Sequence, residues 1–436
     1  MPSIPNSTPV SAKTGSNAPA NYVFPLILVT SLFFMWGFAY GLLDTLNKHF
    51  QDVFHITKMR STLLQVAYFG GYFVMAVPAG AIMTKFGYKK GIIFGLLLYG
   101  IGALLFYPSA RSGSFYFFLI SMFILACGLG CLETGSNPYV TVLGKPESSE
   151  FRLNLSQCFN GIGQFLGPFI AAWLFFGENE FSSSSPHVDT TASLASVQYT
   201  YVIIGVVVLL IAFLFYRTRL PEINEEEQLL SYGKRKSKPL FQNTHFVWGI
   251  VAQFAYVAAQ VGIAAFFINY ATENWEGSTA EIAARLLGVS LILFTVGRFV
   301  GTALMRVLKP HKLLTIYAII NVLLCFYVIY GSGSLSVYVL MAVFFFESIM
   351  FPTIFALSVK NLGAHTRRGG SFVIMAISGG AFIPPVMGWI ADHSSTPAAY
   401  WVPLVCFVVV LYYGLAGYKI KDDVEAPIAT ASPEVP

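Results

Sequence analysis

Two carboxylates, Asp44 and Glu133, occur inside long apolar segments that span 23–46 and 116–142. A charge near the centre of a bilayer costs at least roughly 2.5–3.5 kcal/mol, so intramembrane carboxylates are expected to have a function. A carboxyl group whose surroundings change between dry and wet can bind a proton in one state and release it in another. We therefore predict that both residues couple protons to the movement of a polar solute. The alternative is that each carboxylate only fixes helix packing.

A stripe of amide side chains follows in the apolar segment 153–176. Asn154, Gln157 and Asn160 recur every three residues, which places them on one face of a helix. Amides both donate and accept hydrogen bonds, so they suit sugar hydroxyl groups. Hydrogen bonding between helices is the alternative role. Among the many aromatic residues, Trp36 is our candidate for stacking on a sugar ring.

Arg298 and Glu347 are a further pair of charged residues within apolar segments. Buried charges are normally paired, so we predict that these two neutralise each other. A direct contact of Glu347 with the solute is the alternative.

The composition indicates a membrane protein. The chain is 56% hydrophobic and 11% charged, with a mean hydropathy of +0.66, whereas soluble domains are about 25% charged. No phosphate-binding loop, nucleophile set or His/Cys cluster occurs, so we expect no enzymatic activity, cofactor or metal. The net charge of +5 is spread over short loops, so no nucleic-acid partner is expected, and the lipid bilayer is the expected surrounding.

Apolar segments of about 20 residues can cross a bilayer as helices. Twelve are predicted, over 23–47, 61–84, 91–108, 114–142, 153–176, 198–216, 244–272, 284–305, 311–331, 335–359, 369–391 and 399–418. The fold class is therefore an all-α membrane protein with two six-helix bundles, 23–216 and 244–418. A polar linker, 217–243, joins the bundles, and the tails 1–22 and 419–436 are expected to be disordered and cytosolic.

The loops differ in charge between the two sides of the membrane. Twenty of the 26 Lys and Arg residues fall on the side of the two termini, and five fall on the opposite side. Because cytosolic loops are enriched in Lys and Arg, we expect both termini in the cytosol.

The two halves repeat short motifs at a nearly constant offset. Phe38-Ala39-Tyr40 recurs as Phe254-Ala255-Tyr256, and Glu133-x4-Pro138 recurs as Glu347-x4-Pro352. Such matches predict duplicated six-helix halves with a solute site between them. The residue 216 positions after Asp44 is Gln260, which we add to the expected solute site.

Several motifs resemble the fucose permease branch of the major facilitator superfamily. They are Phe34-x-Trp36-Gly37-Phe38-Ala39-x-x-Leu42-x-Asp44, Leu132-Glu133-Thr134-x-x-Asn137-Pro138-Tyr139, Arg152-Leu153-Asn154-Leu155-x-Gln157-x-Phe159-Asn160 and Phe351-Pro352-Thr353-Ile354-Phe355. The resemblance covers nearly all of the chain between the tails. It implies import of L-fucose, galactose or glucose with protons. By this resemblance Asp44 and Glu133 match the proton-coupling carboxylates, and Gln157 and Asn160 match polar residues of the sugar site.

The chain also departs from that family pattern. Near Asp44 the family commonly carries two amides, where this chain has Tyr40 and Leu43, and Glu347 stands where the family usually has a neutral residue. The proton carriers are thus kept while some sugar contacts change, so the identity of the sugar is left open. The tails and the charged linker resemble those of eukaryotic, fungal members, which implies the plasma membrane, and we expect a functional monomer. An exporter of drugs or organic cations and a non-transporting sugar sensor are the rival functions.

Overall fold

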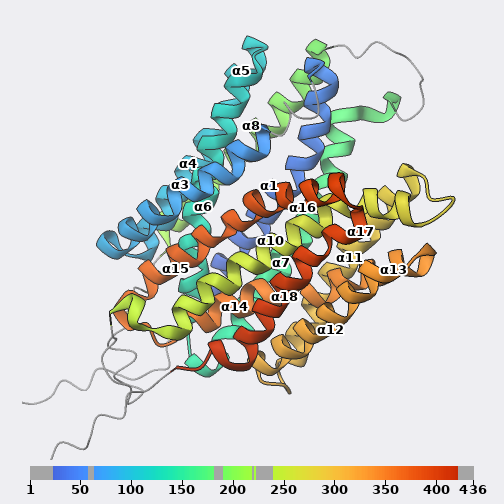
Figure 1. Cartoon of the computed structure of the whole chain (residues 1–436). Helices are drawn as coiled ribbons and strands as arrows, with labels where there is room; N and C mark the ends of the chain where they lie inside the picture. Colours follow the sequence, from blue (N-terminus) through green and yellow to red (C-terminus); the bar gives the residue numbers. More distant parts are fainter. Residues whose placement is uncertain (1–22, 57–62, 181–189, 219, 222–238, 421–436) are drawn as a thin grey trace, which may run out of the picture.

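The computed structural model describes residues 23–56, 63–180, 190–218, 220–221 and 239–420 (Figure 1). Within these ranges every regular element is a helix. The predicted tail 1–22, most of the tail 419–436 and most of the linker 217–243 lie outside the described residues.

The N-terminal half (23–218) consists of six helical passes. They are α1 (Val23–Phe54), α3 (Leu63–Phe86), α4 (Tyr88–Leu104) continued by α5 (Phe106–Ser112), α6 (Phe115–Val142), α7 (Ser149–Glu180) and α8 (Thr190–Arg217), with the short helix η1 (Pro146–Ser148) before α7. Helix α1 packs along α7, while α6 packs between α3 and α4.

The C-terminal half (239–420) repeats this plan with more interrupted helices. Its elements are η2 (Leu240–Gln242), α10 (Thr244–Asn274), α11 (Ala280–Leu304), α12 (Pro310–Tyr330), α13 (Gly333–Glu347), α14 (Met350–Val359), η3 (Gly363–His365), α15 (Thr366–Met375), η4 (Ala376–Ser378), α16 (Gly379–His393), α17 (Thr396–Ala399), α18 (Trp401–Tyr412) and η5 (Tyr413–Gly417). Helix α10 packs against α14, α16 and α18. Figure 1 shows this half beside the group formed by α3 to α6 and α8.

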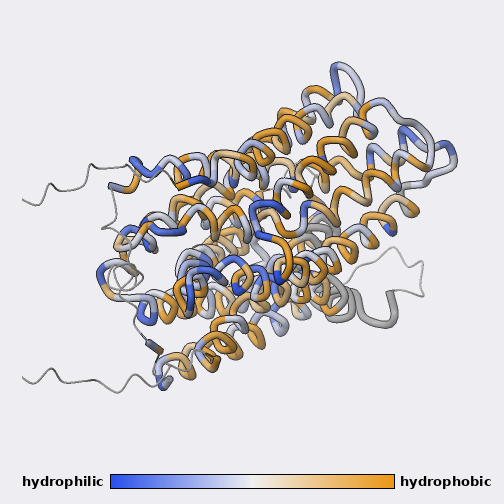
Figure 2. The backbone as a smooth tube through the Cα atoms, turned by 90° about the horizontal axis from the view of Figure 1, so that it is seen from below, coloured by the Kyte–Doolittle hydropathy of each residue, from blue (hydrophilic) through white to orange (hydrophobic). Residues whose placement is uncertain are grey.

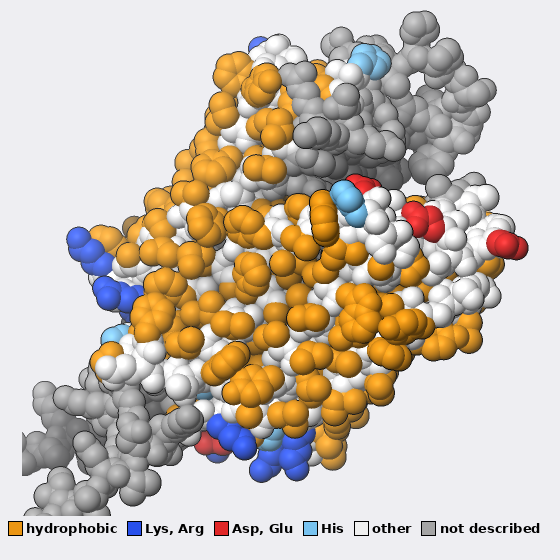
Figure 3. Space-filling model, viewed as in Figure 1, with side chains coloured by type: hydrophobic (Ala, Val, Ile, Leu, Met, Phe, Trp, Pro, Cys, Tyr) orange, Lys and Arg blue, Asp and Glu red, His pale blue; other side chains and the backbone are white. Residues whose placement is uncertain are grey.

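Eleven helical segments of the described chain are long and apolar enough to cross a membrane. Helix α7 is the twelfth pass, because it has 32 residues and packs along α1. Its polar stripe makes it less apolar than the other passes. The surface also fits a protein that spans a membrane. Apolar side chains cover the middle of the visible face, and Lys and Arg gather along its lower and left edges (Figure 3). Hydrophobic residues dominate the helices along their length (Figure 2). The predicted all-α membrane fold is confirmed.

Glycines let the helices of each half approach closely at positions related by the repeat. A Cβ atom at Gly163 of α7 would overlap the backbone of Phe34 and Phe38 in α1. A Cβ atom at Gly379 of α16 would overlap the backbone of Phe254 in α10. Phe38 and Phe254 are the residues matched by the sequence repeat, so the two halves use the same packing contact.

Two passes of the C-terminal half are broken near their middle. Helices α13 and α14 are separated at Ser348, and η4 interrupts the pass made by α15 and α16. Pro352 has no backbone N–H, so it cannot donate to the carbonyl oxygen of Ser348 four residues earlier. The break therefore leaves a carbonyl group inside the protein that needs another donor.

The two halves are joined on the side of the Lys-rich loops, here called the basic face. Lys360 forms an ion pair with Glu150 of α7, and Arg367 of α15 donates from Nη1 to the carbonyl oxygen of Met83 at 2.9 Å. Near the same face, Ser371 of α15 packs against Gly80 of α3. These contacts close the interface between the halves at the basic face.

Candidate functional site

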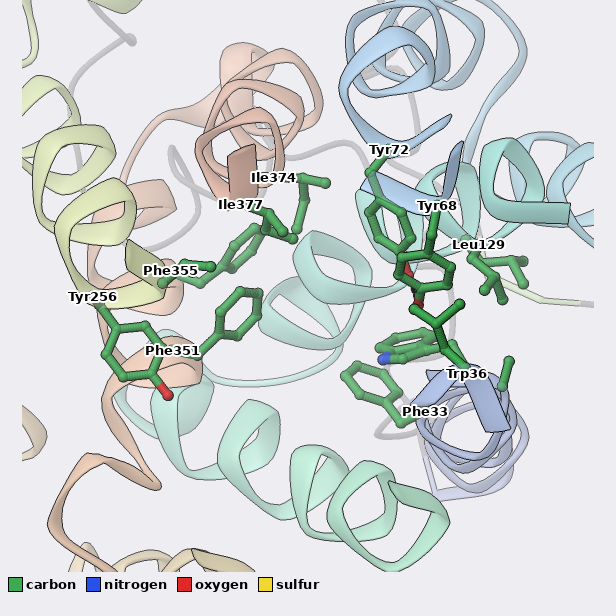
Figure 4. Close-up of a cluster of buried hydrophobic side chains, with 14 of the residues drawn as sticks. Phe33, Trp36, Tyr68, Tyr72, Leu129, Tyr256, Phe351, Phe355, Ile374 and Ile377 are labelled. Carbon is green, nitrogen blue, oxygen red and sulfur yellow. Dashed lines mark hydrogen bonds between the residues drawn. The ribbon is translucent and has the colours of Figure 1, made fainter. Parts of the chain in front are cut away.

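A cavity of about 100 Å³ lies between the two halves. The N-terminal half lines it with Trp36, Tyr40, Tyr68, Phe69, Tyr72, Glu133, Gln157, Asn160 and Gln164, and the C-terminal half with Val257, Gln260, Val261, Arg298, Phe351 and Ile377. One water molecule needs roughly 10–15 Å³ of such space, so the cavity has room for several. Figure 4 shows aromatic side chains of both halves, such as Trp36 and Phe351, on opposite sides of this region. The arrangement offers apolar faces and polar groups to one small solute.

Glu133 of α6 reaches the cavity wall, although only 6% of the residue is exposed. Tyr72 lines the cavity beside Glu133, and both Tyr72 and Arg298 act on its carboxyl group. Tyr72 in turn contacts the hydroxyl group of Tyr68 at 3.3 Å. A carboxyl group at this boundary between protein and cavity can exchange a proton with cavity water.

Arg298 of α11 links the two halves at the base of the cavity. Its Nε donates to the free carbonyl oxygen of Ser348 at 3.1 Å, which satisfies the group left by the helix break. Its Nη1 donates across the interface to the Gln157 carbonyl oxygen and to Asn160 Oδ1, each at 2.9 Å, and to Gln157 Oε1 at 3.4 Å. The guanidinium group also lies over the ring of Phe294, 4.6 Å from its centroid. Arg298 is thus fixed in one half and holds α7 of the other.

The two amides of α7 at the cavity have different freedom. Asn160 is engaged at both ends of its amide, because its Oδ1 accepts from Arg298 and from Gln164 Nε2, while its Nδ2 donates to the Phe33 carbonyl oxygen at 3.2 Å. Gln157 Nε2 is buried and has no hydrogen-bond partner. Gln157 therefore has a donor available for a solute, whereas Asn160 holds α1, α7 and α11 in place.

Asn154, our remaining candidate on α7, does not line the cavity in this conformation. Its Nδ2 donates to the Glu150 carbonyl oxygen at 2.8 Å and to Thr353 Oγ1 of α14 at 3.2 Å. Six residues along a helix separate Asn154 from Asn160 by roughly 9 Å in depth. Asn154 instead belongs to the interface that closes the basic face.

The remaining candidates in the cavity are Trp36 and Gln260. The Trp36 ring is buried and packs against Phe33 with centroids 4.2 Å apart, and the residue lines the cavity. Gln260 lines the opposite wall from α10. The repeat thus located a cavity residue from the position of Asp44 alone. The Asp44 side chain itself lies outside the described residues, and only its place on α1 is known.

Glu347 is completely buried behind the cavity wall, and neither of its carboxyl oxygens has a hydrogen-bond partner. The predicted pairing with Arg298 is not formed in this conformation, because the Nη1 atom of Arg298 is turned toward α7. The charge of Arg298 still acts on Glu347. The pairing stays a prediction for other conformations.

Several cavity residues were not identified from the sequence. Tyr68 and Tyr72 lie four residues apart on α3 and face Glu133, and this spacing was a usable signal. Phe351 precedes the helix-breaking Pro352, which marks the middle of that pass. The contact of Arg298 with α7 joins residues about 140 positions apart, and no local pattern indicated it.

Comparisons with known proteins agree with this architecture. The profile of the Major Facilitator Superfamily matches residues 26–380. The L-fucose-proton symporter of Escherichia coli (strain K12) is 39% identical over 414 residues, which cover 90% of this chain and 93% of that protein. The glucose/galactose transporter of Brucella abortus is 35% identical over 418 residues, 96% of this chain and 99% of that protein.

A solved structure shows the same fold. The crystal structure of the Major Facilitator Superfamily transporter FucP in the outward conformation matches with a TM-score of 0.79 and 38% identity, over 90% of this chain and 98% of that one. At this coverage the similarity includes both halves. This chain therefore belongs to the Major Facilitator Superfamily, in the branch that contains the L-fucose–proton symporter and the glucose/galactose transporters.

Proposed function

We propose that this protein imports a neutral hexose of the L-fucose, galactose or glucose type together with protons, by alternating access of one cavity to the two sides of the membrane. The observation that carries the proposal is a cavity between two repeat-related halves that holds a carboxyl group, a free amide donor and aromatic faces. Relatives named as an L-fucose–proton symporter and a glucose/galactose transporter are similar over nearly their whole length.

The candidate residues then have the following roles. Glu133 and Asp44 bind and release the coupled proton. Gln157 and Gln260 donate to or accept from sugar hydroxyl groups from opposite walls. Trp36 offers an apolar face to the sugar ring.

Asn160 supports the sugar site through the hydrogen bonds that keep α1, α7 and α11 together. In the present conformation the basic face is closed by the Glu150–Lys360 pair and by Arg367, so the cavity would load from the opposite side. With the basic face in the cytosol of a plasma membrane, this direction is import. We propose a monomer as the functional unit, since the two halves of one chain together line the cavity.

The coupling has a defined energetic yield. Moving one positive charge across 100 mV supplies about 2.3 kcal/mol, which corresponds to a nearly fiftyfold accumulation of a neutral solute. A pH gradient would add to this value.

The test is uptake by the full-length protein in proteoliposomes with labelled L-fucose, galactose and glucose, with and without an imposed pH gradient and membrane potential. At least one sugar should accumulate above its external concentration, and a protonophore should abolish the accumulation. An exporter of organic cations would instead leave all sugars equilibrated and would show competition between protons and a cation. A protein that binds sugar without moving it would match a sensor.

A further inference from the structure

Glu347, the last residue of α13, is a second buried carboxyl group that the proposed cycle has not used. It is 0% exposed and both of its oxygens lack hydrogen-bond partners. The groups that act on it from the neighbouring helices are Arg298 of α11, Tyr256 of α10 and Cys325 of α12. The Tyr256 hydroxyl group is also buried without a partner. Within the described residues, Arg298 is therefore the one cation placed to neutralise Glu347.

The neutral carboxyl form is the one that suits the surroundings of Glu347 in the present conformation. An ionised carboxylate without an ion pair or hydrogen bond carries a penalty of several kcal/mol in a dry interior, and such a group takes up a proton instead. Arg298 does not relieve this penalty here, since no ion pair within 4 Å joins the two residues in the described part of the chain.

The hydrogen bonds of Arg298 allow it to change partners when the halves move. Its Nε is held by the Ser348 carbonyl oxygen, which belongs to the residue next to Glu347. All the acceptors of its Nη1 atom lie on α7 of the other half, on Gln157 and Asn160. When α7 and α11 separate at the basic face, the Nε contact can persist, because both of its partners are in the C-terminal half. The Nη1 contacts cannot persist, so Nη1 would then be left without an acceptor.

We propose that Glu347 is the acceptor that receives the Arg298 guanidinium group when the two halves part at the basic face. In this step the O–H bond of the Glu347 carboxyl group breaks, the proton passes to water admitted between the halves, and the carboxylate pairs with Arg298. The partner exchange gives Arg298 an acceptor in both conformations, so it lowers the energy of the state that is open at the basic face. The inference rests on the proposed alternating access.

The variant that tests this proposal is Glu347→Gln, which keeps the shape of the neutral carboxyl group but cannot become an anion. Because Glu347 makes no hydrogen bond now and does not line the cavity, sugar affinity in the present conformation should stay within about twofold. Exchange of labelled for unlabelled sugar should slow by at least tenfold, since it requires the conformation that has lost its ion pair. Glu347→Asp keeps the charge and should recover part of the rate.

The conformational equilibrium can be read without sugar. A cysteine at Val261, which lines the cavity, is alkylated by a membrane-impermeant maleimide added from the side opposite the basic face. Cys127 is replaced by Ser in all samples, because it is the one native cysteine of the described chain that is partly exposed. Glu347→Gln should raise the alkylation rate, as the molecules collect in the present conformation.

Unchanged sugar exchange together with unchanged alkylation in Glu347→Gln would overturn the proposal. Equal losses in Glu347→Gln and Glu347→Asp, with weaker sugar binding in both, would also overturn it and would indicate a packing role. If the parent protein moved no sugar at all, the proposed function would fail, yet the alkylation measurement would still report the effect of Glu347 on the two conformations.

Discussion

Replacing Gln157 by alanine separates solute recognition from the architecture of the cavity. The Gln157 side chain accepts one long contact from Arg298, at 3.4 Å, and its Nε2 donor is unused. The stronger contact of Arg298 goes to the Gln157 backbone carbonyl oxygen at 2.9 Å, which the substitution does not remove. The variant should therefore fold as the parent does.

The expected magnitude follows from the hydrogen bond that the sugar loses. A sugar hydroxyl group that binds Gln157 Nε2 would be left without this partner, at a cost of roughly 1–3 kcal/mol. Sugar affinity should accordingly fall roughly 5- to 150-fold. Asn160→Ala is the contrasting variant, because it removes the hydrogen bonds that join α7 to α1 and α11. It should lower thermal stability as well as binding.

Both variants are compared by equilibrium binding of labelled sugar to purified protein and by thermal unfolding in the same detergent. We expect Gln157→Ala to keep the parent melting temperature and to lose affinity. Parent-like sugar affinity in Gln157→Ala would refute the assignment of this residue to the solute site. A lower melting temperature in Gln157→Ala than in Asn160→Ala would refute the division between recognition and support.

Two further substitutions test how the helices and halves are held. Gly37→Ala places a Cβ atom against the backbone oxygen of Asn160, so α1 and α7 must separate, and stability should fall by about 1–3 kcal/mol in thermal unfolding; an unchanged melting temperature would contradict this close contact. Lys360→Met removes the ion-pair partner of the Glu150 carboxylate, which is only 2% exposed. Because the Lys360 side chain is 27% exposed, water already weakens this pair, and we expect the conformational equilibrium to shift only about tenfold toward opening of the basic face. The shift is measured as slower alkylation of Val261→Cys from the side opposite the basic face, and adding Glu150→Gln to Lys360→Met should reverse most of it. Equal alkylation rates in the parent, the single variant and the double variant would contradict the role of the Glu150–Lys360 pair in closing the basic face.

Hydropathy alone predicted the passes, because a helix that crosses a bilayer needs about 20 apolar residues wherever it lies in the chain. The position of Glu133 at the cavity was predictable for a related reason, since a carboxylate that faced lipid would be too costly. The repeat also located Gln260 on the opposite wall, because duplicated halves place matching residues at matching depth.

Depth within the membrane and contacts between the halves were harder to predict. Spacing along α7 does not give the depth of Asn154, so its hydrogen bond to Thr353 of the other half was not predicted. The position of Arg298 depends on the orphaned Ser348 carbonyl group and on acceptors in the other half. The first of these could have been found from Pro352, whereas the second follows only from the packing of distant segments.

Proton coupling through Glu133 is tested most directly with Glu133→Gln, measured in one preparation of proteoliposomes for both accumulation and exchange of sugar. Glutamine keeps the size of the side chain but carries no titratable proton. We predict that accumulation driven by a proton gradient falls to equilibration, while exchange of labelled for unlabelled sugar continues at a measurable rate. Accumulation equal to that of the parent protein would contradict the account.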